Sequence, residues 1–435
     1  MSEDSPVIIG AGLSGLAISH FLSEAGVAHV LIGALPDSRP RLGESIDPAG
    51  TVALLEFFPE YSRYFHLKRY VSVYTGGYAG VCDFKSNALR TLGLRLLGFG
   101  TGDEFVHVDR IGFDRALADR TVVNPSCTHR DLLVESMRYD PASDRIDHLR
   151  LSDGTTMRPR FVFDATNHVR LVARKAEIGI EWAGDLQRVA FRHYRAPDEA
   201  SDDCRGGGWK HCTSLLRMYR DSDGLDGVAW CIPLGGYVSV GGSVDADATD
   251  LGDDRIVELT VDAYERRGLK LREEFPHPSE TIGVRNRYFV HERACGGNWL
   301  LAGPSFGQVW FPTSSGVGCA LLAGLIAPRL LESPGEVGPA FEDYVRGLLR
   351  SHVLFDEIIY RDPADLTAAR ITEVAEEIVA ENIKRVTKLA NFTGGPAAGV
   401  FARLFHWLAD KKVMRAGWQV HEADLPQQTT AVFHA

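Results

Sequence analysis

VIIGAGLSG, residues 7–15, decides the fold of this chain: its apolar run predicts a strand, its glycines predict a tight turn, and residues 16–25 read as a helix. In such a turn the first glycine permits the bend, the second lets a pyrophosphate approach the backbone, and the third lets the helix pack closely on the strand. Because the helix N-terminus offers unpaired N–H groups to an anion, this segment predicts a dinucleotide site rather than a plain glycine-rich turn. The candidate cofactor-binding residues here are Gly10, Ala11, Gly12, Leu13, Ser14 and Gly15.

The expected second strand, Ala28–Ile32, does not end as a dinucleotide site usually requires. An acidic residue about 20 residues after the glycines normally binds the adenosine ribose. Gly33 stands there instead, and Asp37 follows four residues later. Three alternatives stay open: Asp37 reaches back, backbone and water hold the ribose, or the nucleotide binds weakly.

Composition and charge narrow the class of protein. The chain has 435 residues, is 45% hydrophobic, and carries 58 acidic against 47 basic residues, a net charge of −11. A nucleic-acid partner is not expected, because phosphate binding needs a basic face. The longest apolar run, Val317–Ala327, is too short to span a bilayer and predicts a core helix. The acidic N-terminus lacks an apolar signal core, so we expect a cytoplasmic protein. The seven cysteines form no CxxC pair and no metal motif occurs, so we expect no metal site.

The segment RPRLGESIDP, residues 39–48, carries a family resemblance. It resembles the RxGES-x-x-P segment that follows the second strand in flavin-dependent halogenases and their monooxygenase relatives. The resemblance implies FAD as cofactor, with Arg41 near its pyrophosphate and with Glu44 and Ser45 lining it. The alternative is an exposed polar loop.

The resemblance continues in VHVDRIGFDRALAD, residues 106–119, where the match implies that Arg110 lies near the flavin. Phe113 and Leu117 are four residues apart and should face the core from one helix. Residues 144–164 read as a hairpin that turns at Asp153-Gly154. Asn167 replaces a family glycine after Asp164, and Asn tolerates left-handed backbone angles better than most residues.

Later in the chain the family pattern is incomplete. Gly303 matches it, but Pro304 stands where an aspartate usually binds the ribityl chain of the flavin. Ser315, Gly316 and Val317 match a turn that opens a helix beside the flavin ring, and in halogenases this turn also holds chloride. Each lost hydrogen bond costs roughly 0.5–1.5 kcal/mol. The two missing acidic anchors should therefore weaken FAD binding by about tenfold to a hundredfold.

The pattern of apolar, polar and turn residues along the chain predicts its strands, helices and domains. Alternating segments separated by Gly and Asp clusters predict an antiparallel sheet between residues 171 and 295, at 186–194, 213–219, 228–232 and 237–240. Residues 254–269, 340–360 and 366–389 predict helices. We expect an α/β, Rossmann-like FAD-binding domain at 1–65, 105–170 and 296–335, an antiparallel substrate domain at 66–104 and 171–295, and a helical C-terminal region at 336–435.

The candidate chemistry rests on a few side chains. Lys68 lies where halogenases carry the lysine that guides hypohalous acid, and it is the candidate catalytic residue. However, Val228 replaces the first tryptophan of the halogenase WxWxIP motif, whereas Trp230 is kept. The aromatic residues Trp230, Phe306, Trp310 and Phe311 are candidates for a substrate wall, with core packing as the alternative for each.

The resemblance implies an FAD-dependent monooxygenase of natural-product biosynthesis that oxidises a small aromatic or polyene substrate through a flavin C4a-hydroperoxide. A separate flavin reductase would supply reduced flavin, since no second nucleotide motif occurs. Halogenation with Lys68 is one alternative. Another is a non-redox role, as a cyclase, isomerase or binding partner, with weak or lost FAD binding. Whether the substrate arrives free or tethered to a carrier protein, and the oligomeric state, stay open.

Overall fold

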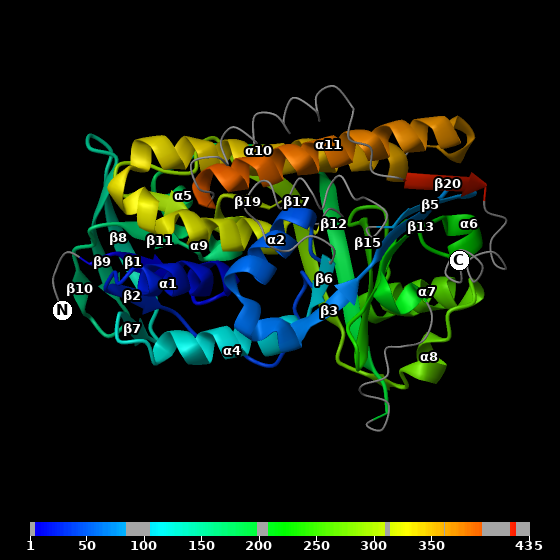
Figure 1. The fold of residues 1–435 in the computed structure, drawn as a ribbon, viewed down its shortest axis with the longest axis horizontal. Coiled ribbons are helices and arrows are strands. Elements are labelled where there is room, and N and C mark those ends of the chain that lie inside the picture. The colour runs from blue at the N-terminus through cyan, green and yellow to red at the C-terminus, as the bar shows by residue number, and fades with distance from the viewer. Residues whose placement is uncertain are drawn as a thin grey trace.

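The computed structural model describes residues 5–83, 105–197, 208–308, 314–360, 362–393 and 418–422. A five-stranded sheet and a ten-stranded sheet lie at opposite ends of the long axis of the molecule, and two long helices run across both (Figure 1). This mixed α/β architecture with a helical C-terminal region agrees with the expected fold class.

The five-stranded sheet is entirely parallel and follows the order β18-β11-β1-β2-β7. All its strands except the edge strand β7 are fully buried and mainly apolar, as expected for a parallel sheet that is covered on both faces. The bounds are β1 (Val7–Ile9), β2 (His29–Ile32), β7 (Cys127–Arg130), β11 (Val162–Asp164) and β18 (Trp299–Leu301).

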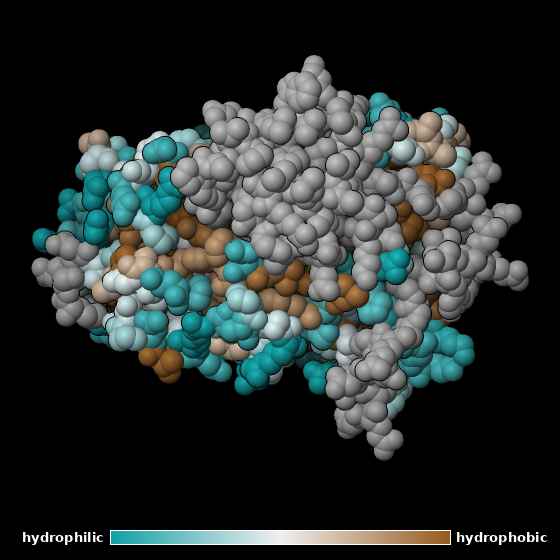
Figure 2. Space-filling view, viewed as in Figure 1, coloured by the Kyte–Doolittle hydropathy of each residue, from teal (hydrophilic) through white to brown (hydrophobic). Residues whose placement is uncertain are grey.

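Three helices pack beside this sheet: α1 (Leu13–Glu24), α4 (Arg110–Val122) and α9 (Gly316–Glu332). Phe113 and Leu117 are fully buried on α4, which confirms the predicted core face of that helix. The apolar run of α9 is also buried, and α9 contacts α1 closely where Gly324 meets Ala17. In the part of the chain described here, no helix combines the length and apolarity needed to cross a bilayer. Hydrophilic residues predominate on the visible surface around α4 (Figure 2).

The predicted hairpin over residues 144–164 is only partly correct. The turn at Asp153-Gly154 joins β9 (Arg145–Leu151) to β10, but β10 spans only Thr156–Met157. The last residues of the expected return strand, Val162–Asp164, form β11 in the other sheet, where they pair in parallel with β1 and β18. The second neighbour of β9 is instead β8 (Val134–Asp140).

The ten-stranded sheet confirms the strands predicted from alternation. All its pairings are antiparallel except that of β4 with β13. One face packs against α7 (Asp253–Arg266), which confirms the helix expected there. Its strands are β4 (Tyr70–Thr75), β5 (Tyr78–Asp83), β12 (Ile180–Arg195), β13 (Cys212–Met218), β14 (Gly227–Pro233), β15 (Tyr237–Asp245), β16 (His277–Pro278), β17 (Ile282–His291), β19 (Gly307–Gln308) and β20 (Trp418–Glu422).

The long helices α10 (Pro334–Ile359) and α11 (Ala368–Thr393) confirm the two helices expected after residue 336 (Figure 1). The C-terminal region is not all helical, however, because β20 pairs with β5 at the sheet edge. The domain limits given above stay a prediction, although β19 and β20 join the sheet from outside the expected substrate domain.

The remaining elements are α2 (Pro48–Phe57), β3 (Phe65–Lys68), β6 (Phe105–Val108), α5 (Leu171–Lys175), α6 (Arg220–Asp223), α8 (Leu271–Glu274) and the 3-10 helices η1 (Pro59–Tyr64), η3 (Asn167–Val169), η5 (Gly208–His211), η6 (Gly303–Ser305) and η7 (Pro363–Asp365).

Candidate functional site

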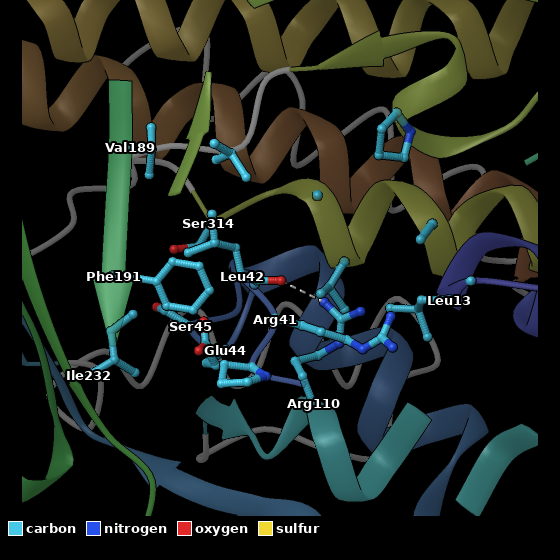
Figure 3. A pocket seen from close by; sticks show the side chains of 18 of the residues that line it. Leu13, Arg41, Leu42, Glu44, Ser45, Arg110, Val189, Phe191, Ile232 and Ser314 are labelled. Atoms are coloured by element: carbon cyan, nitrogen blue, oxygen red, sulfur yellow. Dashed lines mark hydrogen bonds between the residues drawn. The ribbon is translucent and has the colours of Figure 1, made fainter. Parts of the chain in front are cut away.

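A cavity of ≈ 350 Å³ lies where the turn after β1, the segment 40–45 and one face of the ten-stranded sheet meet. Figure 3 shows Arg41 and Arg110 near Leu13 on one side of it, and Val189, Phe191 and Ile232 on the other. The cavity therefore has a polar half beside α1 and an apolar half against the sheet.

The three glycines after β1 each have a distinct steric role. Gly10 adopts φ +105°, and a Cβ there would overlap the carbonyl oxygen of Ala165. A Cβ at Gly15 would overlap the carbonyl oxygen of Gly10, so this glycine sets the close packing of α1 on β1. A Cβ at Gly12 would meet nothing within 4 Å, and Gly12 lines the cavity. Space is therefore open at the position where a pyrophosphate would approach.

The N-terminus of α1 faces this open space without a cap. Gly12 is the N-cap residue, no side chain accepts a hydrogen bond from the first turn, and that turn holds no acidic residue. Leu13 and Ser14 line the cavity beside it, whereas Ala11 is buried outside the lining. Uncapped N–H groups and the positive end of the helix dipole favour an anion at this position.

The carboxylate of Asp37 binds two arginines and does not extend toward the end of β2. It accepts from Arg39 Nε at 2.6 Å and from Arg41 Nη2 at 2.9 Å. Arg41 lines the cavity, and its Nε is buried without a hydrogen-bond partner. Gly33 adopts φ +131° and offers no side chain. Asp37 thus positions Arg41, and the buried Nε–H of Arg41 stays available to a ligand.

A second helix also begins at the cavity. Ser314 adopts φ +59°, Ser315 is the N-cap of α9, and Gly316 and Val317 line the cavity. Gly303 lies behind the wall, where a Cβ would overlap Ser14 Oγ, while Pro304 contributes to the lining. Asn167 also lines the cavity with φ +58°, which confirms the left-handed conformation expected for it.

Arg110 fixes the segment that carries the Gly-Glu-Ser motif. Its Nε and Nη2 donate to the two carboxylate oxygens of Asp114 at 2.9 and 2.8 Å, and its Nη1 donates to Leu42 O at 3.1 Å (dashed in Figure 3). Such a buried bidentate pair holds the guanidinium rigidly. Arg110 therefore lines the cavity while three of its N–H groups bind protein.

Lys68 is buried but does not line the cavity. Its Nζ donates to Ser45 Oγ and to Ile46 O, both at 2.8 Å. Ser45 Oγ also lies 2.7 Å from Thr213 Oγ1, which is 2.9 Å from His107 Nε2. Ser45 and Thr213 line the cavity, so the hydrogen bond from Lys68 Nζ to Ser45 Oγ links the buried ammonium group to the cavity wall.

Glu44 forms a second buried contact in the same corner. Its Oε1 lies 2.9 Å from His193 Nε2, and both side chains are almost fully buried. Its Oε2 is buried without a partner although Glu44 lines the cavity. The ring of His193 stacks on Tyr237 at 4.7 Å, and burial raises the pKa of Tyr237 far above its ordinary value.

The apolar wall comes from alternate residues of four strands, which point to one face of the sheet. Trp230 lies over Gly241, where a Cβ would overlap the indole, and its Nε1 donates to Ser239 Oγ at 3.4 Å. Phe191 contacts Trp230 with ring centroids 6.4 Å apart. The other apolar residues of this wall are Val189, Leu215, Ile232, Ile282 and Val284.

Known structures share this arrangement of sheets and helices. A variant of the halogenase PltM in complex with FAD is 14% identical, over 93% of this chain and 86% of that one, with a TM-score of 0.67. A flavoprotein/dehydrogenase from Cytophaga hutchinsonii is 18% identical, over 94% and 99% of the two chains, with a TM-score of 0.62. BrvH, a flavin-dependent halogenase from Brevundimonas sp. BAL3, is 13% identical, over 94% and 97%, with a TM-score of 0.62.

The chain has the halogenase-like flavoprotein fold. At these identities the likeness establishes the fold and leaves the reaction open. No protein-family model and no curated protein sequence matches the chain.

Within this flavoprotein fold, the structure separates the predicted site residues into two groups. Those that line the cavity are Gly12, Leu13, Ser14, Arg41, Glu44, Ser45, Arg110, Trp230, Gly316 and Val317. The remaining described ones are not part of its lining: Gly10, Ala11, Gly15, Lys68, Gly303, Phe306 and Ser315. Phe306 is fully buried and packs against Phe341 at 6.0 Å, so it contributes to the core rather than to the cavity. Trp310 and Phe311 lie outside the described residues.

Sequence reasoning missed His107, His193 and Thr213. His107 lies inside the segment 106–119 that was matched to the family, but a single histidine in a strand carries no signal of its own. Thr213 and His193 face the cavity side only because their strands are in register with β14 and β15. Among the described residues, no group of three or more His, Cys, Asp or Glu side chains could hold a metal ion.

Proposed function

We propose that this protein is an FAD-dependent oxidoreductase that oxygenates a small apolar organic substrate, with reduced flavin supplied by a separate reductase. One observation carries the proposal: the uncapped N-terminus of α1 at Gly12 opens into the same cavity as the wall of Phe191 and Trp230. A site for an anionic nucleotide is thus continuous with a site for an apolar molecule.

The residues present fit FAD. Gly12 leaves room for the pyrophosphate, the N–H groups of α1 face it, and the buried Nε of Arg41 lacks a partner. A structure with the same fold, the PltM variant, is a complex with FAD. Because Gly33 and Pro304 offer no carboxylate, we expect the affinity to be lower than in a site with both acidic anchors.

FAD, when bound and reduced, would supply the activation of dioxygen. The residues of this chain would bind and orient. Arg41 and the N–H groups after Gly12 would hold the phosphates, and the turn 315–317 would support the flavin ring. Phe191 and Trp230 would exclude water from the reacting region and hold the substrate by apolar contact.

Halogenation is the second candidate, because buried Lys68 lies one hydrogen bond from the cavity and several structures of this fold are halogenases. Two features favour oxygenation instead. Val228 replaces the first tryptophan of the halogenase motif, and the amine of Lys68 lies behind Ser45 rather than in the cavity lining.

The test is to load the protein with FAD, reduce it chemically, and mix it with oxygen and a panel of aromatic substrates, with and without bromide. We expect an oxygenated product by mass spectrometry, independent of bromide. A brominated product that disappears in Lys68→Ala, while flavin oxidation continues, would establish halogenation. A colourless protein that binds no FAD in a titration would support the non-redox role instead.

A further inference from the structure

A second hollow, of ≈ 480 Å³, lies between η1 and α4, and the proposed function does not use it. Its lining shares no residue with the cavity described above. Arg110 and Asp114 of α4 line that cavity, whereas Arg115 and Asp119 line the hollow, so the two sites lie on different sides of one helix. The hollow is named the α4 hollow below.

The floor of the α4 hollow is an aromatic ring that lies against the helix. A Cβ at Gly112 would stand 2.5 Å from the ring of Tyr64, so only glycine lets this ring pack there. The guanidinium of Arg63 lies 4.7 Å from the centroid of the same ring, and its Nη2 donates to the Tyr64 hydroxyl at 2.6 Å. Ala116 adds an apolar contact to the lining. The hollow therefore combines an apolar floor with a positive charge.

Tyr61 brings a buried hydroxyl without an acceptor to this lining. The residue is only 5% exposed, and its ring packs on Phe58 and Phe113 at 6.1 and 5.4 Å. Its hydroxyl oxygen is buried and has no hydrogen-bond partner. Burial raises the pKa of Tyr61, so the hydroxyl keeps its hydrogen, although nearby Arg120 opposes the shift. A guanidinium only donates, so that hydrogen still lacks an acceptor, which a ligand oxygen would supply.

Two arginines of the lining have no carboxylate partner. Arg120 is not one of them, since it pairs with Glu60 and, at 3.5 Å, with Glu24. Arg63 and Arg115 form no ion pair with any residue that the structure describes. A guanidinium matches the planar geometry of a carboxylate and can donate two parallel hydrogen bonds to it. The α4 hollow thus offers two free cations and one free hydroxyl hydrogen to an anion.

The charge of the hollow selects a monoanion. Asp119 is also in the lining and leaves one net positive charge beside Arg63 and Arg115. A carboxylate neutralises that charge, whereas a phosphate dianion exceeds it. We propose that the α4 hollow binds a small aromatic carboxylate, with its ring on Tyr64 and its carboxylate accepting from Tyr61 and from the two arginines. This site is independent of the flavin site, and its ligand binds whether or not FAD is present.

The experiment compares benzoate with benzamide, which has the same ring and no charge. Isothermal titration is carried out on the protein with and without saturating FAD. We expect saturable binding of benzoate in both forms, at least about fivefold tighter than that of benzamide. Crystals soaked in 4-bromobenzoate should show the anomalous signal of bromine beside Tyr64 rather than in the cavity of Phe191 and Trp230.

Two variants assign the binding to this hollow. Arg115→Gln should weaken benzoate binding by about fivefold or more. Its control is Arg138→Gln on β8, with 74% of the side chain exposed, which should change the affinity by less than about twofold. Tyr61→Phe should weaken benzoate binding by about threefold to tenfold, while the midpoint of urea unfolding stays the same or rises, because the lost hydroxyl had no acceptor. A purely structural hydroxyl would give the reverse: a lower midpoint and unchanged affinity.

Three results would overturn the inference. The first is the absence of saturable benzoate binding, and the second is equal affinity for benzoate and benzamide. The third is benzoate binding that both Arg115→Gln and Tyr61→Phe leave unchanged, because the ligand would then lie elsewhere on the protein.

Discussion

Lys68 Nζ donates to Ser45 Oγ at 2.8 Å, which places a buried cation directly behind the cavity wall. Replacing Lys68 by Met would leave Ile46 O and the Ser45 hydroxyl without this donor. We expect the free energy of unfolding, measured in urea, to fall by about 1–3 kcal/mol. Lys210→Met is the control, because Lys210 is partly exposed and pairs with Glu274 at 3.5 Å. Its expected loss is below about 1 kcal/mol. Equal losses in the two variants would contradict the buried position of Lys68.

Gly12 and Gly15 are three residues apart but should respond differently to the same substitution. Gly12→Ala places a methyl group in open space, so the free energy of unfolding should change by less than about 0.5 kcal/mol. FAD affinity should fall by about tenfold, because the methyl occupies the approach of the pyrophosphate. Gly15→Ala should instead lose about 1–3 kcal/mol of stability, because its methyl overlaps Gly10 O. Urea unfolding and FAD titration separate these effects. Unchanged FAD affinity in Gly12→Ala would place the cofactor elsewhere.

Arg39 and Arg41 share Asp37 as partner, but only Arg41 lines the cavity. Arg41→Gln removes a charged donor from the expected pyrophosphate site, so FAD affinity should fall by about tenfold or more. Arg39, with 78% of its side chain exposed, serves as the control, and Arg39→Gln should change the affinity by less than about twofold. Equal effects would mean that the two arginines act only through general charge.

His352 and Asp356 on α10, whose Nε2 and Oδ2 atoms lie 3.4 Å apart, are shifted mainly by burial and should give opposite contributions to stability as pH changes. Burial raises the pKa of Asp356 from 3.8 to about 7 and lowers that of His352 from 6.5 to about 4. The folded state therefore binds the Asp356 proton more tightly than the unfolded state does, so raising the pH from about 4 to 7 costs stability. It binds the His352 proton less tightly, so raising the pH from about 4 to 6.5 adds stability.

Single substitutions separate these two contributions. In Asp356→Asn the burial of His352 remains although its neighbouring carboxylate is lost, and the free energy of unfolding should rise between about pH 4 and 6.5. In His352→Gln the Asp356 contribution remains, and stability should fall up to about pH 7. Urea unfolding at a series of pH values measures both profiles. Parallel profiles in the two variants would disprove the opposite shifts.

The sequence predicted the fold well wherever local pattern decides structure. The glycine spacing after Val7–Ile9 and the period-two segments of the large sheet are local signals, and their elements formed as expected. The hairpin prediction failed at Val162–Asp164, because an apolar run is compatible with either sheet and its pairing with β1 and β18 is decided at long range. The strand Trp418–Glu422 was missed because its pairing with β5 joins distant parts of the chain.

The residues of the candidate site also fall into those that a local motif predicts and those that only long-range packing brings together. Cavity-lining residues on recognisable motifs, such as Gly12, Arg41 and Ser45, could be named from the sequence. His107 and Thr213 could not, because their hydrogen bond joins residues 106 positions apart and depends on sheet register. The unpartnered oxygen of Glu44 is likewise a property of packing, which spacing along the chain does not contain.

Titration of the purified protein with FAD, followed by calorimetry and by the absorbance of oxidised flavin, tests the central claim most directly. The account predicts saturable binding of one FAD per chain, weakened by Gly12→Ala and by Arg41→Gln. Absence of binding at a large excess of FAD, in a protein that unfolds cooperatively in urea, would contradict it.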